Sequence, residues 1–251
     1  MKNSEFYKII NAETIDRFAH TNAELINGKI KGVVTRFHGY GGCNTSLPID
    51  ELDKFFAEHN ILSFYPFYGP WAWANDVCLA MIDRIIDILC DIHGLDENIP
   101  LVIHGQSMGG MTSLLYTRHA ALCGSPLKLV GCAADCPVCD LDVLWKTRRD
   151  IFSSLISAYG HYDCSFEEAV RRTNPLALVS DMPDIPYYIV QGELDGEFDP
   201  LQQAGVFVPE LKKYAGDVYY EFVPGMAHCS MTQEIASRYF DFIVKTIERN
   251  S

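Results

Sequence analysis

The sequence lacks a long uninterrupted hydrophobic segment and is poor in basic residues. Its first residues, MKNSEFYKIINAETIDRF, contain no apolar stretch of the kind that forms a signal peptide, and no other run is apolar enough to span a bilayer. Lys and Arg number 20 against 33 Asp and Glu, which gives a formal net charge of −13. That charge disfavours binding to nucleic acid and to anionic membranes, so we expect neither as a partner.

The sequence also lacks a cysteine or glycine pattern that would hold a cofactor. Nine scattered cysteines without a signal peptide favour reduced thiols and a cytoplasmic location over a disulfide framework. Cys136 and Cys139 have C-x-x-C spacing, but no second pair and no adjacent histidine completes a zinc set, so we expect packing thiols and no metal. No P-loop is present, and no dinucleotide-binding G-x-G-x-x-G follows a predicted strand. The sequence therefore predicts no cofactor.

What the sequence does contain is a regular alternation of short apolar runs and amphipathic segments. The 251 residues are 48% hydrophobic and 21% charged, as in an ordinary globular protein, and show no repeat or linker, so we expect one domain over 1–251. Predicted strands cover 31–37, 60–67, 99–105, 127–134, 185–192 and 218–224, and predicted helices cover 50–59, 76–94, 111–124, 199–216 and 231–250. This alternation predicts an α/β fold with a parallel sheet covered on both faces.

One region interrupts the alternation. Residues 136–183 contain helical patterns at 141–160 and 165–174, where the alternation of strands and helices predicts a strand. The region is too small to be an independent domain, and we interpret it as an insertion between two strands. We expect it to cover the site as a partial lid.

Four loops that follow predicted strands carry residues that can take part in catalysis. They are HGYGG at 38–42, GQSMG at 105–109, GELD at 192–195 and PGMAH at 224–228. Ligands bind at the carboxyl ends of the strands in sheets of this kind, so the four loops are expected at one edge.

The residue types in these loops suit nucleophilic catalysis. The hydroxyl of Ser107 is a weak nucleophile that needs a base, and His228 can accept its proton near neutral pH. Asp195 can fix the imidazole tautomer and stabilise the imidazolium. Gly105 and Gly109 leave room for a sharp strand-to-helix elbow that lifts Ser107 to the start of the helix.

The motifs HGYGG, GQSMGG, GELD and GMAH, in the order Ser, Asp, His, resemble those of the α/β-hydrolase superfamily over 38–228. Residues 174–229 are similar to the catalytic domain of its prolyl-oligopeptidase-like and acyl-peptidase-like branch, a pattern shared with small esterases that include dienelactone-hydrolase-like ones. The resemblance implies a mostly parallel central sheet with helices on both faces and a short helical insertion before the acid-bearing strand. The first strands of the family sheet are hard to find before Lys31, so we expect an abbreviated or irregular N-terminal part.

The resemblance also implies roles for single residues. Ser107 resembles the nucleophile, His228 the general base and Asp195 the acid. The N–H of Met108 resembles one donor of the oxyanion hole, and the second is expected from Tyr40, with Gly41 as the alternative.

Several of these roles have competitors in the sequence. Asp199 and Asp135 are alternatives for the acid, since one lies near Asp195 and the other follows an earlier strand. The phenol of Tyr40 is an alternative substrate contact. His38 and His104 precede glycines at strand ends, and we expect them to pack and to orient loops.

The aromatic stretch at 64–76 follows a predicted strand, which gives two interpretations: a wall for the substrate or packing under a loop. If it binds substrate, Tyr68, Trp71 and Trp73 are the candidates. We expect a cofactor-free carboxylesterase that acts on a small-molecule ester. A peptidase for short peptides, an acyltransferase or thioesterase, and a non-catalytic ligand receptor are the alternatives. The given sequence has no room for the β-propeller of the larger peptidases, which disfavours the peptidase alternative. A homodimer is a further expectation that the sequence does not decide.

Overall fold

The strands of this protein form a single seven-stranded sheet. The computed structural model describes residues 5–42 and 48–251. Its strands are β1 (Ala19–Thr21), β2 (Gly32–Thr35), β3 (Ile61–Pro66), β4 (Pro100–Gln106), β5 (Lys128–Asp135), β6 (Tyr187–Gly192) and β7 (Val218–Val223). They are ordered β1-β3-β2-β4-β5-β6-β7, and every neighbouring pair is parallel except the antiparallel pair of β1 and β3.

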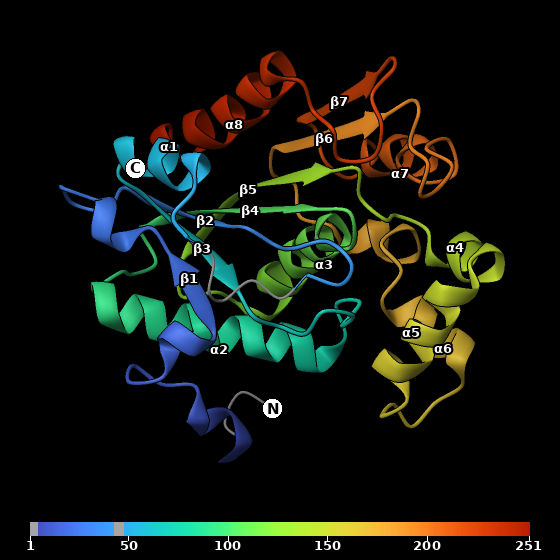
Figure 1. Cartoon of the computed structure of the whole chain (residues 1–251), viewed down its shortest axis with the longest axis horizontal. Helices are drawn as coiled ribbons and strands as arrows, with labels where there is room; N and C mark the ends of the chain where they lie inside the picture. The colour runs from blue at the N-terminus through green and yellow to red at the C-terminus, as the bar shows by residue number, and fades with distance from the viewer. Residues whose placement is uncertain (1–4, 43–47) are drawn as a thin grey trace.

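Helices cover both faces of this sheet (Figure 1). The α-helices are α1 (Glu51–Glu58), α2 (Asp76–His93), α3 (Met108–Cys123), α4 (Leu141–Thr147), α5 (Arg149–Tyr159), α6 (Phe166–Arg172), α7 (Ala204–Leu211) and α8 (Gln233–Glu248). The 3-10 helices are η1 (Glu5–Ile9), η2 (Ile15–Arg17), η3 (Ala23–Leu25) and η4 (Leu176–Asp181). None of the helices within 5–42 and 48–251 combines the length and apolar character that crossing a membrane requires.

The near-continuous apolar strands are explained by burial on both sides. In β6, Tyr188 and Val190 pack in the cluster that contains side chains of α1 and α8. Tyr187 and Ile189 alternate with them and pack in a cluster with α7. Because successive side chains of a strand point to opposite faces, a strand between two helical layers has no polar face.

The predicted elements are found close to their expected positions, with three differences. The strand β1 was not predicted, since it has three residues and depends on pairing with the distant β3. The helix expected over 199–216 is confined to α7. The helical pattern at 141–160 is divided at Arg148, whose extended backbone (φ −119°, ψ 110°) separates α4 from α5.

The insertion at 136–183 contains α4, α5, α6 and η4, and its three α-helices lie beyond the carboxyl end of the sheet (Figure 1). Hydrogen bonds tie it to the loop before α2, among them one from Trp73 Nε1–H to Ser154 Oγ at 2.9 Å. The hydroxyl of Tyr159 donates to the carbonyl oxygen of Trp73 at 3.0 Å, and the side-chain amide of Asn75 donates to the carbonyl oxygen of Ala158 at 2.8 Å. These contacts fix α5 at the carboxyl end of the sheet. Opening and closing of this insertion as a lid stays a prediction.

Candidate active site

Ser107 occupies the turn between β4 and α3 in a conformation that few residues other than glycine adopt. Its φ of 57° and ψ of −123° lie outside the regions favoured by L-residues. The surrounding structure holds it there: its N–H donates to the carbonyl oxygen of Asp135 at 2.8 Å, and its carbonyl oxygen accepts from the N–H of Met111 at 3.1 Å. Strain that neighbouring hydrogen bonds enforce is typical of functional positions.

Two glycines make this tight turn possible. A Cβ atom at Gly105 would lie 2.2 Å from the carbonyl oxygen of Gly109, and one at Gly109 would lie 2.2 Å from the carbonyl oxygen of Phe37. Strand β4, helix α3 and the loop after β2 therefore touch backbone to backbone. This contact brings the loop at 38–42 beside Ser107.

We expect Gly109→Ala to lower the free energy of unfolding by about 3 kcal/mol or more, because the added methyl group must displace backbone rather than a flexible side chain. Gly196→Ala is the matched control, since a Cβ atom there meets nothing within 4 Å. Urea denaturation of both variants measures the difference. Equal stability of the two variants would contradict the close packing at the elbow.

His228 joins Ser107 to Asp195. Its Nε2 lies 2.9 Å from Ser107 Oγ, and its Nδ1 lies 2.7 Å from Asp195 Oδ2. The Asp195 side chain has no exposed surface, whereas His228 is 19% exposed. The three residues come from the ends of β4, β6 and β7, so the parallel sheet brings together positions that are 121 residues apart in the sequence.

The acid is held in place by further hydrogen bonds. The side-chain amide of Gln191 donates to Asp195 Oδ2 at 2.9 Å, and the N–H of Glu197 donates to Oδ1 at 2.9 Å. The ring of Phe198 stands edge-on to the His228 imidazole with 4.9 Å between centroids. These contacts fix the orientation of both the carboxylate and the imidazole.

Electrostatic coupling separates the pKa values of the pair. Burial by itself would raise the pKa of Asp195, but the hydrogen bond and charge of His228 outweigh it and lower that pKa. Burial would lower the pKa of His228, but the hydrogen bonds and charges of Asp195 and Cys136 outweigh it and raise that pKa. Asp195 is thus kept as an anion that stabilises the imidazolium.

Asp199 and Asp135, the two other candidate acids, form no hydrogen bond with His228 in the described part of the chain. Asp199 is exposed, and its Oδ1 accepts from the N–H of Leu201 at 2.9 Å in a local turn. Asp135 is buried at the end of β5, and desolvation holds its pKa well above the usual range for a carboxyl group. Of the three candidate acids, only Asp195 is hydrogen-bonded to the histidine.

Two further histidines occupy packing positions. His104 is buried, with its Nδ1 2.9 Å from the hydroxyl of Tyr239. The ring of His38 is also buried and stacks on Tyr68, with 4.1 Å between centroids and 5° between planes. Neither has a hydrogen bond to Ser107 within the described chain.

Two backbone N–H groups beside Ser107 have no acceptor. Among residues 5–42 and 48–251, the N–H groups of Tyr40 and Met108 form no hydrogen bond with the protein. The N–H of Gly41, the alternative donor, is already used, since it donates to the carbonyl oxygen of Pro70 at 2.8 Å. A Cβ atom built on Gly39 would lie 3.4 Å from Cβ of Ser107, so this loop approaches the hydroxyl closely.

Ser107 and His228 line a cavity of about 380 Å³. Tyr40, in the loop after β2, and Trp73, in the loop after β3, also line it. The insertion contributes further lining residues, namely Val138, Leu144, Arg148 and Ile151. Arg148 also donates to the carbonyl oxygen of Glu197 at 2.8 Å, which joins the insertion to the loop that carries the acid.

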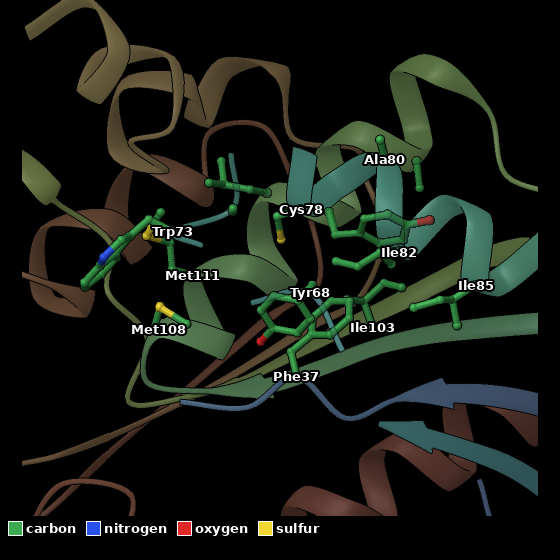
Figure 2. Packing of buried hydrophobic residues seen from close by; sticks show 14 of the residues in the cluster. Phe37, Tyr68, Trp73, Cys78, Ala80, Ile82, Ile85, Ile103, Met108 and Met111 are labelled. Carbon is green, nitrogen blue, oxygen red and sulfur yellow. The ribbon is translucent and has the colours of Figure 1, made fainter. Parts of the chain in front are cut away.

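Of the three aromatic residues expected to bind substrate, only Trp73 lines this cavity. The assignment of Tyr68 is wrong: it is 2% exposed, and its hydroxyl donates to the carbonyl oxygen of His38 at 2.9 Å. Figure 2 shows Tyr68 packed beside Phe37 within the core, whereas Trp73 lies near Met111. Sequence periodicity could not separate these residues, because the loop has no regular geometry.

Trp71 also lies outside the cavity lining. It is 52% exposed, and its ring centroid lies 6.4 Å from that of Tyr40. Tyr40 lines the cavity and Trp71 contacts Tyr40, so Trp71 is not in the cavity lining itself.

Cys136 and Cys139 do not form a pair. Cys139 packs with Leu114 and α7, and Cys136 packs with α8 on the other side of the sheet. The neighbour of Cys136 is Cys229, which no sequence pattern predicted: the N–H of Cys229 donates to Cys136 Sγ at 3.3 Å. Arg148 and Gln191 were not predicted either, and their only signal was the place of Arg148 within the insertion and of Gln191 directly before the acid motif.

Comparison with known proteins finds similarity at the level of structure. No protein-family model and no curated protein sequence matches the chain. A puromycin-hydrolyzing peptidase of Mycobacterium tuberculosis is 20% identical with a TM-score of 0.70, over 89% of this chain and 35% of its own. Esterase B of Lactobacillus Rhamnosis (HN001) is 14% identical with a TM-score of 0.64, over 90% and 78%. The Pyrococcus horikoshii acylaminoacyl peptidase is 15% identical with a TM-score of 0.70, over 90% and 38%.

These likenesses show a shared fold. The chain spans about a third of the length of the two peptidases and about four fifths of that of the esterase.

Proposed function

Since this chain has the α/β-hydrolase fold, we propose that it is a serine hydrolase that cleaves a carboxylic ester through an acyl-enzyme on Ser107. One observation carries the proposal: His228 bridges Ser107 Oγ and Asp195 Oδ2 at 2.9 and 2.7 Å. A serine hydroxyl becomes a useful nucleophile when a base lies within hydrogen-bond reach and a third group orients that base.

In the first step, Ser107 Oγ attacks the carbonyl carbon of the ester and its proton passes to Nε2 of His228. Asp195 accepts a hydrogen bond from Nδ1–H and stabilises the imidazolium that forms. The carbonyl oxygen becomes an oxyanion, and we expect it to accept hydrogen bonds from the N–H groups of Tyr40 and Met108, which have no partner among the described residues. The intermediate then expels the alcohol, which takes the proton from Nε2.

The second step repeats the chemistry with water. His228 accepts a proton from a water molecule, the resulting hydroxide attacks the acyl-serine carbonyl carbon, and collapse releases the carboxylic acid while Ser107 recovers its proton. Every step uses groups that the chain itself supplies, so the proposal includes no cofactor.

The cavity supports an ester with an apolar portion. Its lining beside Ser107 includes Trp73, Leu144 and Ile151, whose side chains can take up an alkyl or aryl group. The peptidase alternative rests on the likeness to the M. tuberculosis and P. horikoshii enzymes, which concerns about a third of each.

The test is a panel of chromogenic esters and amides. Hydrolysis of p-nitrophenyl esters from acetate to octanoate is compared with that of aminoacyl-p-nitroanilides. We expect ester cleavage that depends on chain length and weak or no anilide cleavage. Anilide cleavage alone would replace the proposal with a peptidase. Failure of a fluorophosphonate to label the folded protein would replace it with a non-catalytic receptor.

A backbone variant tests the oxyanion role of Tyr40. Tyr40→Pro removes the N–H, and we expect kcat to fall by about 10²- to 10³-fold, as for the loss of one oxyanion donor. Tyr40→Ala is the matched control because it removes the side chain and keeps the N–H. An equal loss of kcat in both variants would assign the function to the phenol instead, since both substitutions remove it.

A further inference from the structure

Two cysteines that are 93 positions apart meet at the proposed base. Cys136 is the first residue after β5, and Cys229 directly follows His228. One sulfur atom from each cysteine and one ring nitrogen of His228 all lie within 4.8 Å of one another. This is the one such group of three potential metal ligands among the described residues.

The donor set matches the preference of a borderline-soft divalent cation. Zn²⁺ binds cysteine sulfur at about 2.3 Å and histidine nitrogen at about 2.0–2.1 Å in a tetrahedral arrangement, which places donor atoms roughly 3.5–4 Å apart. Three donors already within 4.8 Å need small movements to reach that spacing. Two thiolates and one imidazole disfavour Mg²⁺ and Ca²⁺, which prefer oxygen.

Both cysteines have a backbone conformation that is unusual for residues other than glycine. Cys136 has a φ of 42° and Cys229 a φ of 48°, values that cost energy for residues other than glycine. The N–H of Cys229 points at Cys136 Sγ.

The group is accessible and lies beside an unsatisfied polar atom. His228 and Cys229 line the cavity, which gives a cation a path from solvent, and Cys136 is fully buried behind them. Asp135, which is 2% exposed, interacts with both thiols, and its Oδ1 has no hydrogen-bond partner among the described residues. A buried polar atom without a partner is rare in proteins, and a water molecule or ion bound beside it is one explanation.

We propose that Cys136, Cys229 and His228 bind one Zn²⁺ ion, and that this ion inhibits the hydrolase. Binding forms two Zn–S bonds and one Zn–N bond and releases to solvent the protons that the two sulfur atoms and the bound ring nitrogen carry. Both nitrogens of His228 serve the proposed reaction, since Nδ1 is bonded to Asp195 and Nε2 to Ser107. A metal that takes either nitrogen therefore removes the base or its orientation, while Ser107 stays in place.

Binding is tested first without any catalysis. Full-length Ser107→Ala protein, reduced and freed of metal, is titrated with Co²⁺ and then Zn²⁺. We expect one equivalent of Co²⁺ to give thiolate-to-cobalt charge-transfer absorption, and Zn²⁺ to displace it. Cys229→Ser in the same background should lose that absorption, and Cys123→Ser, which changes an exposed thiol elsewhere, should keep it.

Inhibition is tested next with protein that has an intact Ser107. We expect Zn²⁺ to inhibit p-nitrophenyl ester hydrolysis reversibly, with EDTA restoring activity. Cys229→Ser and Cys136→Ser should each raise the inhibitory concentration by at least about tenfold, and Cys123→Ser should leave it unchanged. Equal Zn²⁺ sensitivity in all variants, or absence of thiolate–cobalt absorption in Ser107→Ala, would overturn the metal site. Because the cobalt titration needs no turnover, an inactive enzyme would refute the proposed function and leave this inference to its own test.

Discussion

Ser107→Ala is expected to reduce ester hydrolysis by about 10⁶-fold, which is the order seen when a nucleophile that acts as one unit with its base is removed. The physical reason is that the acyl-enzyme forms on Ser107 Oγ, the oxygen that lies 2.9 Å from the base nitrogen, His228 Nε2. Alanine removes this oxygen. Steady-state hydrolysis of p-nitrophenyl butyrate measures the loss. Fluorophosphonate labelling, followed by mass spectrometry, should also disappear with the hydroxyl.

The control for this variant is its stability. Alanine keeps the Cβ atom and the backbone hydrogen bonds of position 107, so circular dichroism and the thermal midpoint should stay close to those of the wild type. A loss of activity with an unchanged fold assigns a chemical role to the hydroxyl. Turnover that survives in Ser107→Ala would refute the proposed mechanism.

Asp195→Asn is expected to reduce kcat by about 10⁴-fold, because an amide in this position no longer stabilises the imidazolium and favours the wrong tautomer of His228. The carboxylate is fully buried and bonded to Nδ1 at 2.7 Å, so water cannot replace it. The effect on KM should be small, since Asp195 does not line the cavity. Separate kcat and KM values therefore distinguish this role from substrate binding.

Two matched variants make this prediction specific. Asp199→Asn changes an exposed carboxylate four residues away, and Asp135→Asn changes a buried carboxyl group near His228 that is not bonded to it. We expect each to change kcat by less than about tenfold. A larger loss of kcat in Asp135→Asn than in Asp195→Asn would move the acid to β5.

The sequence by itself determined the order of strands and helices and the residues at the ends of the strands. Local pattern was sufficient because each strand is buried on both faces, as the alternation of Tyr187 and Tyr188 between two clusters shows. The elbow around Ser107 was also readable, since only glycine tolerates the close backbone contacts at Gly105 and Gly109. The three-residue strand β1 was not readable, because it depends on pairing with residues more than 40 positions away.

Only the tertiary structure decided which side chains face the cavity and which sulfurs meet. Tyr68 and Trp73 stand five positions apart in one loop, yet one is hydrogen-bonded in the core and the other borders the cavity. Cys139 lies three positions from Cys136 in the sequence, whereas the sheet brings Cys229 to Cys136 from 93 residues away. The physical reason is the same in both cases: spacing along the chain fixes geometry within a strand or a helix, but in a loop the backbone turns freely and the packed neighbours determine the direction of each side chain.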